Sequence, residues 1–103
     1  MDYQTKNMII KALMKVVDDA PTKSSMQYTP YFQPYTVSKE RFDLWINYIY
    51  SVMKIISSYV DVSMCLSNIN KITMQPNANN EYSLQVNSIC QIILDFARTI
   101  LNL

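Results

Sequence analysis

Residues 38–70, SKERFDLWINYIYSVMKIISSYVDVSMCLSNIN, determine the fold that the sequence predicts. The stretch contains neither proline nor glycine, the two residues that most often interrupt a helix. Apolar side chains fill four of its seven heptad columns: Phe42 and Ile49 share one column, and Trp45 and Val52 share another. A further column consists of Tyr48, Ile55, Val62 and Ile69. We therefore predict one continuous helix over about 38–70 that is buried on most of its circumference.

The start of this helix carries the clearest local signal in the chain. Ser38 is a favourable N-cap residue, and Glu40 places a negative charge in the first turn, near the positive end of the helix dipole. Val37, just before the cap, is positioned to contact Phe42 as a hydrophobic staple.

Shorter helices are predicted on either side of the long one. The first runs over about 2–19, with apolar residues at helical spacing, and ends before Pro21. The last runs over about 81–103, with Asn80 as its cap and Glu81 in its first turn. Its apolar seam alternates steps of four and three, and Gln85 is among the residues expected to face away from it. The seam consists of Tyr82, Val86, Ile89, Ile93, Phe96, Ile100 and Leu103.

A difference in length between these helices predicts self-association. At ~1.5 Å per residue, some 31 residues of the middle helix give a rod of roughly 46 Å, while the first helix is roughly 27 Å long and the last about 33 Å. Two shorter helices cannot cover the apolar circumference of the longer one, whereas an equivalent helix from a second subunit can. We expect an all-α three-helix bundle with one long central helix, assembled as a homodimer or higher oligomer.

An arm rich in proline and aromatic residues, 21–36, connects the first two predicted helices. Its three prolines and its lack of helical period indicate an extended segment. Its aromatic rings are too apolar for an ordinary linker, so something must cover them. The arm is either a strap across the helices or an exposed recognition surface. The rings concerned are Tyr28, Tyr31, Phe32 and Tyr35.

Composition limits the class of protein. The 103 residues fit one helical domain, 1–103, and the absence of glycine disfavours tight hairpins. Charged residues make up 17%, below the roughly 25% typical of globular domains, which suggests a surface that needs a partner. A net charge of +1 without a basic cluster makes nucleic acid an unlikely partner. No membrane span or signal peptide is expected, and the predicted location is the cytoplasm.

The residue inventory argues against an enzyme. The chain has no histidine, so a hydrolytic triad or a Cys–His dyad lacks its base. Cys65 and Cys90 stand 25 positions apart in apolar stretches, where buried free thiols are expected and a zinc site is not. Without glycine there is no Walker loop or dinucleotide fingerprint. We expect no catalytic residue, metal or cofactor.

The leading functional hypothesis is a non-enzymatic protein-binding module, plausible as a small phage-type inhibitor or adaptor acting on a host protein complex. Abundant isoleucine, asparagine, lysine and tyrosine have A/T-rich codons, which suggests a low-GC bacterium, its phage or a similar virus and includes host defence among the targets. Aromatic and arginine side chains often dominate protein contacts. The predicted partner-binding residues are Tyr28, Tyr31, Phe32, Tyr35 and Arg41.

Two alternatives belong to other classes. A nucleotide or second messenger could be sequestered at the start of the middle helix, where backbone amides attract an anion and a tryptophan could stack on a base. The residues for that site are Ser38, Lys39, Arg41 and Trp45. The third hypothesis is a structural subunit of a larger assembly.

Overall fold

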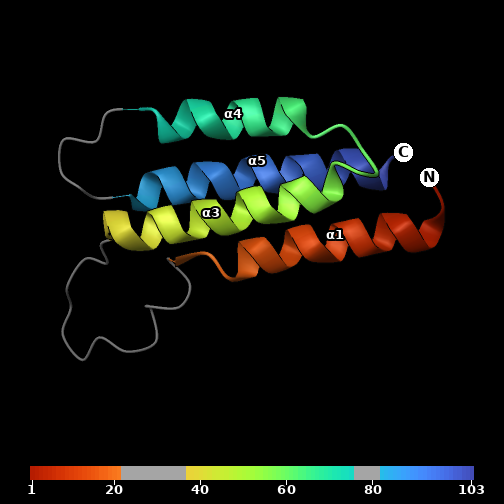
Figure 1. The fold of residues 1–103 in the computed structure, drawn as a ribbon, viewed down its shortest axis with the longest axis horizontal. Helices are drawn as coiled ribbons and strands as arrows, with labels where there is room; N and C mark the ends of the chain where they lie inside the picture. Colours follow the sequence, from red (N-terminus) through yellow and green to blue (C-terminus); the bar gives the residue numbers. More distant parts are fainter. Residues whose placement is uncertain (22–36, 76–81) are drawn as a thin grey trace.

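The computed structural model describes residues 1–21, 37–75 and 82–103. Within these ranges the chain is all-α, with four helices and no strand (Figure 1). The helices are α1 (Tyr3–Asp18), α3 (Lys39–Ile56), α4 (Ser63–Thr73) and α5 (Ser83–Leu101). None of the described helices is long and apolar enough to cross a membrane.

The helices run side by side along the long axis of the molecule (Figure 1). α1 packs against α5 and α3, while α4 packs against α5. In Figure 1, α1 and α4 therefore lie on opposite sides of α5. Each helix contributes apolar residues at helical spacing to one core, for example Ile9 and Leu13 of α1, Ile49 of α3 and Ile93 of α5.

The predicted helix over 38–70 is wrong in one respect, because it is two helices rather than one. α3 ends at Ile56, residues 57–62 form a turn, and α4 begins at Ser63. Figure 1 shows that α4 then runs back in the opposite direction along α5. The described chain thus has four helices where the sequence predicted three.

Short polar side chains cause the break without proline or glycine. Ser57 donates its hydroxyl to the carbonyl oxygen of Lys54 at 2.6 Å, a local bond that competes with continuation of the helix. Beyond it, the Ser58 amide bonds three residues back, to Ile55, instead of four. Asp61 then accepts hydrogen bonds from the amide and hydroxyl of Ser63, which satisfies a backbone donor at the start of α4.

The break removes the length argument for self-association. α3 has 18 residues and α5 has 19, so the two helices differ by only about one residue, or ~1.5 Å. The predicted long helix, with more apolar surface than its neighbours could cover, does not form. Its second half is α4, which folds back and packs against α5 of the same chain. Self-association stays a prediction without that support.

The start and end of α5 differ from the predicted helix over 81–103. Tyr82 is the N-cap, and no side chain there makes a capping hydrogen bond. The predicted cap Asn80 and first-turn Glu81 lie outside the described residues. At the other end α5 stops at Leu101, and Leu103 is 70% exposed rather than part of the apolar seam.

Gln85 was expected to face away from the core but is buried. Its Nε2 donates to the backbone carbonyl oxygens of Ile72 at 3.3 Å and Gln75 at 3.4 Å. These carbonyls lie at the end of α4, where helical partners run out. A polar residue in the core therefore joins the C-terminal end of α4 to α5.

Trp45 joins α3 to the C-terminal end of α1 by a similar side-chain hydrogen bond. Its ring is buried in the core, and its Nε1–H donates to the carbonyl oxygen of Val16 at 3.0 Å. In the last turn of α1, the Asp19 amide bonds to Lys15 and the Ala20 amide bonds to Val17. The indole thus satisfies a helix-end carbonyl from another element.

Trp45→Phe should destabilise the protein by about 1–3 kcal/mol, because the Val16 carbonyl stays buried and loses its donor while an aromatic ring is retained. The measurement is urea unfolding followed by circular dichroism at 222 nm. Tyr50→Phe, which alters an aromatic residue near the surface of the same helix, should change the free energy of unfolding by less than about 0.5 kcal/mol. Equal effects of the two substitutions would contradict the assigned role of the indole.

Candidate functional site

The residues predicted to bind an anion lie together at the start of α3. Ser38 is the N-cap, as predicted, and its Oγ accepts a hydrogen bond from the Arg41 amide at 3.3 Å. Lys39 forms an ion pair with Asp43 at 2.9 Å. The hydrogen bond and the charge of Asp43 raise the pKa of Lys39, which therefore stays protonated.

These contacts already engage the groups that a nucleotide would need. The Ser38 hydroxyl caps the helix, and the Lys39 ammonium is paired with a carboxylate. The ring of Trp45 is only 4% exposed, so its faces pack in the core and have little surface for stacking on a base. The described geometry therefore gives the nucleotide hypothesis no support.

Tyr28, Tyr31, Phe32 and Tyr35 lie outside the described residues. Their assignment as partner-binding residues stays a prediction, as does the choice between strap and recognition surface.

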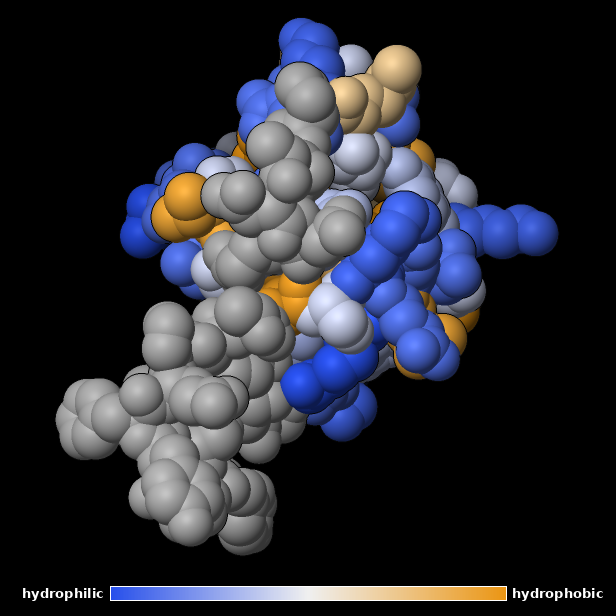
Figure 2. Space-filling view, turned by 90° about the vertical axis from the view of Figure 1, so that its left-hand side faces the viewer, coloured by the Kyte–Doolittle hydropathy of each residue, from blue (hydrophilic) through white to orange (hydrophobic). Residues whose placement is uncertain are grey.

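A shallow cavity of about 250 Å³ lies where the end of α1 meets the first half of α3. This end of the molecule faces the viewer in Figure 2, where hydrophobic atoms are visible among hydrophilic residues. The cavity brings together two residues that the sequence singled out, Arg41 and Trp45, with four that it did not. Its lining consists of Asp19, Pro21, Arg41, Leu44, Trp45 and Tyr48.

The cavity has charge of both signs at its edge. The Tyr48 hydroxyl donates to Asp19 Oδ2 at 3.3 Å, and the same oxygen pairs with Lys15 at 3.4 Å. Burial, reinforced by the negative charge of Asp19, raises the pKa of Tyr48, so the phenol stays protonated and continues to donate. Arg41 supplies a guanidinium on the α3 side.

An exposed apolar row continues from this cavity along α3. Leu44, Tyr48 and Ile55 are separated by four and seven residues, which places them on one face of the helix. Leu44 is 65% exposed and Ile55 is 67% exposed, while Tyr48 is half-buried. The row spans eleven residues of α3, or ~16 Å, with the exposed Ser51 between Tyr48 and Ile55.

α1 contributes one further exposed apolar side chain, Met8, and the charged Lys15 lies between Met8 and Asp19 on the same face of the helix. Asp19 receives the Tyr48 hydrogen bond, and Met8 lies eleven residues earlier on the same face of α1. Met8 is 46% exposed. Because α1 and α3 are antiparallel neighbours (Figure 1), Met8 lies toward the Ile55 end of the row. We call Met8, Arg41, Leu44, Tyr48 and Ile55 together the α1–α3 face.

Sequence reasoning missed most of the α1–α3 face. It assigned Tyr48 and Ile55 to an apolar column of a helix buried on most sides, and it gave Leu44 no role. The prediction did not include the break after Ile56. Because of that break, residues that share a heptad column before and after it lie on separate helices and need not face the same neighbour. The pair Ser57–Ser58 was the available signal for that break.

The cavity beside the α1–α3 face is lined by aliphatic, aromatic and charged side chains. The residues lining the α1–α3 cavity include no cysteine, and the chain has no histidine. Across the described ranges, no cluster of three or more histidine, cysteine, aspartate or glutamate residues is arranged to hold a metal ion. Neither Cys65 nor Cys90 is part of a disulfide, and Cys65 is buried.

No family model matches the chain, and no similar curated protein or solved structure was found.

Cys65 should react very slowly with alkylating agents. Burial raises the pKa of its thiol to about 11 from the ordinary value of 9.0, which lowers the thiolate fraction at pH 8 about a hundredfold. We expect iodoacetamide to modify Cys65 in a Cys90→Ser variant at least about a hundred times more slowly in buffer than in 8 M urea. Mass spectrometry measures both rates, and folded and unfolded rates within tenfold of each other would contradict the burial of this thiol.

Proposed function

We propose that this chain is a non-enzymatic protein-binding module that uses the α1–α3 face as its contact surface. The exposed apolar row Leu44–Tyr48–Ile55 is the observation that carries the proposal. Exposed apolar side chains that share one helix face, rimmed by polar residues, often mark a site of protein–protein interaction. Since the whole chain is only 17% charged, few polar groups are available to make this surface favourable in water.

The mixture of groups on the α1–α3 face suits a protein partner better than a small ligand. Aliphatic side chains supply area to bury, and Tyr48 with Arg41 adds an aromatic ring and a guanidinium, two groups that often dominate binding energy. The cavity beside them is shallow and lies at one end of the row. A flat, extended surface of this kind matches the geometry of a protein interface.

The biological role proposed for the module is a small inhibitor or adaptor that acts on a host protein complex. The A/T-rich codon bias implied by the composition supports a phage or low-GC bacterial source. The predicted aromatic arm joins Pro21 to Val37, and Pro21 itself lines the cavity of the α1–α3 face. The described end of the predicted arm, Pro21, therefore lies at this cavity.

Leu44→Glu combined with Ile55→Glu should abolish partner capture. The free energy needed to bury two unpaired carboxylates in the interface exceeds the binding free energy that the replaced apolar contacts contribute. Both residues are exposed, so the helical circular dichroism and the free energy of unfolding should stay within about 0.5 kcal/mol of wild type. The measurement is affinity capture from the native host, with the captured proteins quantified by mass spectrometry.

Leu84→Glu is the matched control, since Leu84 is 76% exposed on α5, away from the α1–α3 face. It should capture the same proteins as wild type.

Tyr31→Ala with Phe32→Ala tests the arm separately and should also abolish capture. Light scattering on the purified protein shows whether the captured partner is a second copy. Capture that survives the Leu44 and Ile55 substitutions would refute the proposed surface.

A further inference from the structure

A second groove lies on the other side of α5, between α4 and α5. It has a volume of about 340 Å³ and a largely apolar floor. Met64 and Cys65 contribute from α4, and Ile92 and Phe96 contribute from α5. Met64 is 75% exposed, and the half-buried Ile92 and Phe96 pack against the core. We call this depression the α4–α5 groove.

The length of the groove fits a helix. Its lining runs from Asp61 to Asn68 on one side and from Ile92 to Thr99 on the other, seven residues in each direction. On a helix this corresponds to two turns, or ~10 Å. A docked helix places side chains at positions i, i+4 and i+7 over the same distance, so two or three of them can enter the groove.

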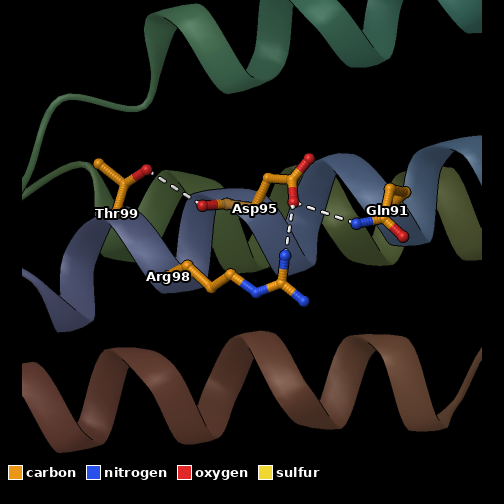
Figure 3. A network of polar contacts seen from close by, with 4 residues as sticks. All are labelled: Gln91, Asp95, Arg98 and Thr99. Atoms are coloured by element: carbon orange, nitrogen blue, oxygen red, sulfur yellow. Dashed lines mark hydrogen bonds and ion pairs between the residues drawn. The ribbon is translucent and has the colours of Figure 1, made fainter.

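The charged residues that line the groove are all negative. Its eight lining residues include two carboxylates, Asp61 and Asp95, and no lysine or arginine. Hydrogen bonds from Ser63 lower the pKa of Asp61, so this carboxylate is ionised at neutral pH. Arg98 does pair with Asp95 at 3.3 Å, but Figure 3 shows the arginine side chain extending toward α1 while Asp95 lies on the side of α4.

Each carboxylate keeps one oxygen available. The Ser63 amide and hydroxyl both donate to Asp61 Oδ1, and Gln91 and Arg98 both donate to Asp95 Oδ1 (Figure 3). Within the described ranges, Oδ2 of Asp61 and Oδ2 of Asp95 therefore accept no hydrogen bond. Two acceptor oxygens with negative charge thus lie beside an apolar floor.

We propose that the α4–α5 groove binds an amphipathic helix of a partner protein that carries lysine or arginine beside its apolar anchors. Apolar side chains of the helix enter between Met64 and Phe96, and its cations contact Asp61 and Asp95. The flexible thioether of Met64 can adapt to anchors of different shape. A nucleic acid does not fit this site, because its phosphates would meet two carboxylates and no cation.

Panning a phage-displayed library of random 16-residue peptides against the whole chain tests the proposal. We expect the enriched peptides to have apolar residues at i, i+4 and i+7 together with lysine or arginine. Synthetic versions should bind the wild-type protein and bind the Asp61→Asn, Asp95→Asn variant about ten times more weakly in fluorescence anisotropy. Asparagine keeps an acceptor oxygen, so the Ser63 bonds and the start of α4 are retained.

A charge-matched control separates the groove from net charge. Glu40→Gln with Asp43→Asn removes the same two charges from α3 and should leave peptide affinity within about twofold of wild type. The Leu44→Glu, Ile55→Glu variant should also bind the peptides normally, which distinguishes this site from the α1–α3 face. Failure to enrich basic amphipathic peptides, or equal affinity for the wild-type and the Asp61, Asp95 variants, would overturn the proposal.

Discussion

The reversal of the chain between Ile56 and Ser63 is the constraint on which the arrangement of the helices depends. Without it, residues 63–73 would continue away from α5, and Cys65 and Ile69 could not reach the core that they share with Ile89. The reversal uses side chains rather than special backbone residues, because serines and an aspartate offer local hydrogen bonds in place of the helical ones. Once α4 lies on α5, Gln85 can satisfy its terminal carbonyls from within the core.

The same reversal explains which parts of the fold could be predicted. Apolar spacing correctly indicated an all-α chain and helices near 2–19 and 81–103, since period alone determines these. It could not separate α3 from α4, because both keep the same period and no proline or glycine lies between them. Assigning Tyr48, Ile55, Val62 and Ile69 to one column was therefore half right: Val62 and Ile69 are buried, whereas Ile55 is exposed and Tyr48 is only half-buried.

At the candidate site, features that depend on neighbouring residues in the sequence could be predicted, whereas features that depend on the packing of distant helices could not. Capping by Ser38 was predictable because it depends on residues three positions apart. The environment of Trp45 was not, because its hydrogen-bond partner Val16 lies 29 residues away in the sequence. A tryptophan two turns into a helix could equally face a ligand or the core until the position of α1 is known. Leu44 escaped notice for the same reason, since exposure is decided by the neighbouring helix.

Two apolar surfaces on one small bundle have a consequence for the proposed role. The cavity beside the α1–α3 face is lined by charges of both signs, from Arg41 and Asp19, whereas the charged residues lining the α4–α5 groove are the carboxylates Asp61 and Asp95. Partners that complement one surface are therefore poorly matched to the other. The two surfaces are formed by different pairs of helices, and α1 and α4 lie on opposite sides of α5 (Figure 1). An inhibitor that only blocks a target needs one such surface, while an adaptor needs two with different specificities. Within the proposed function, the arrangement of charges favours the adaptor.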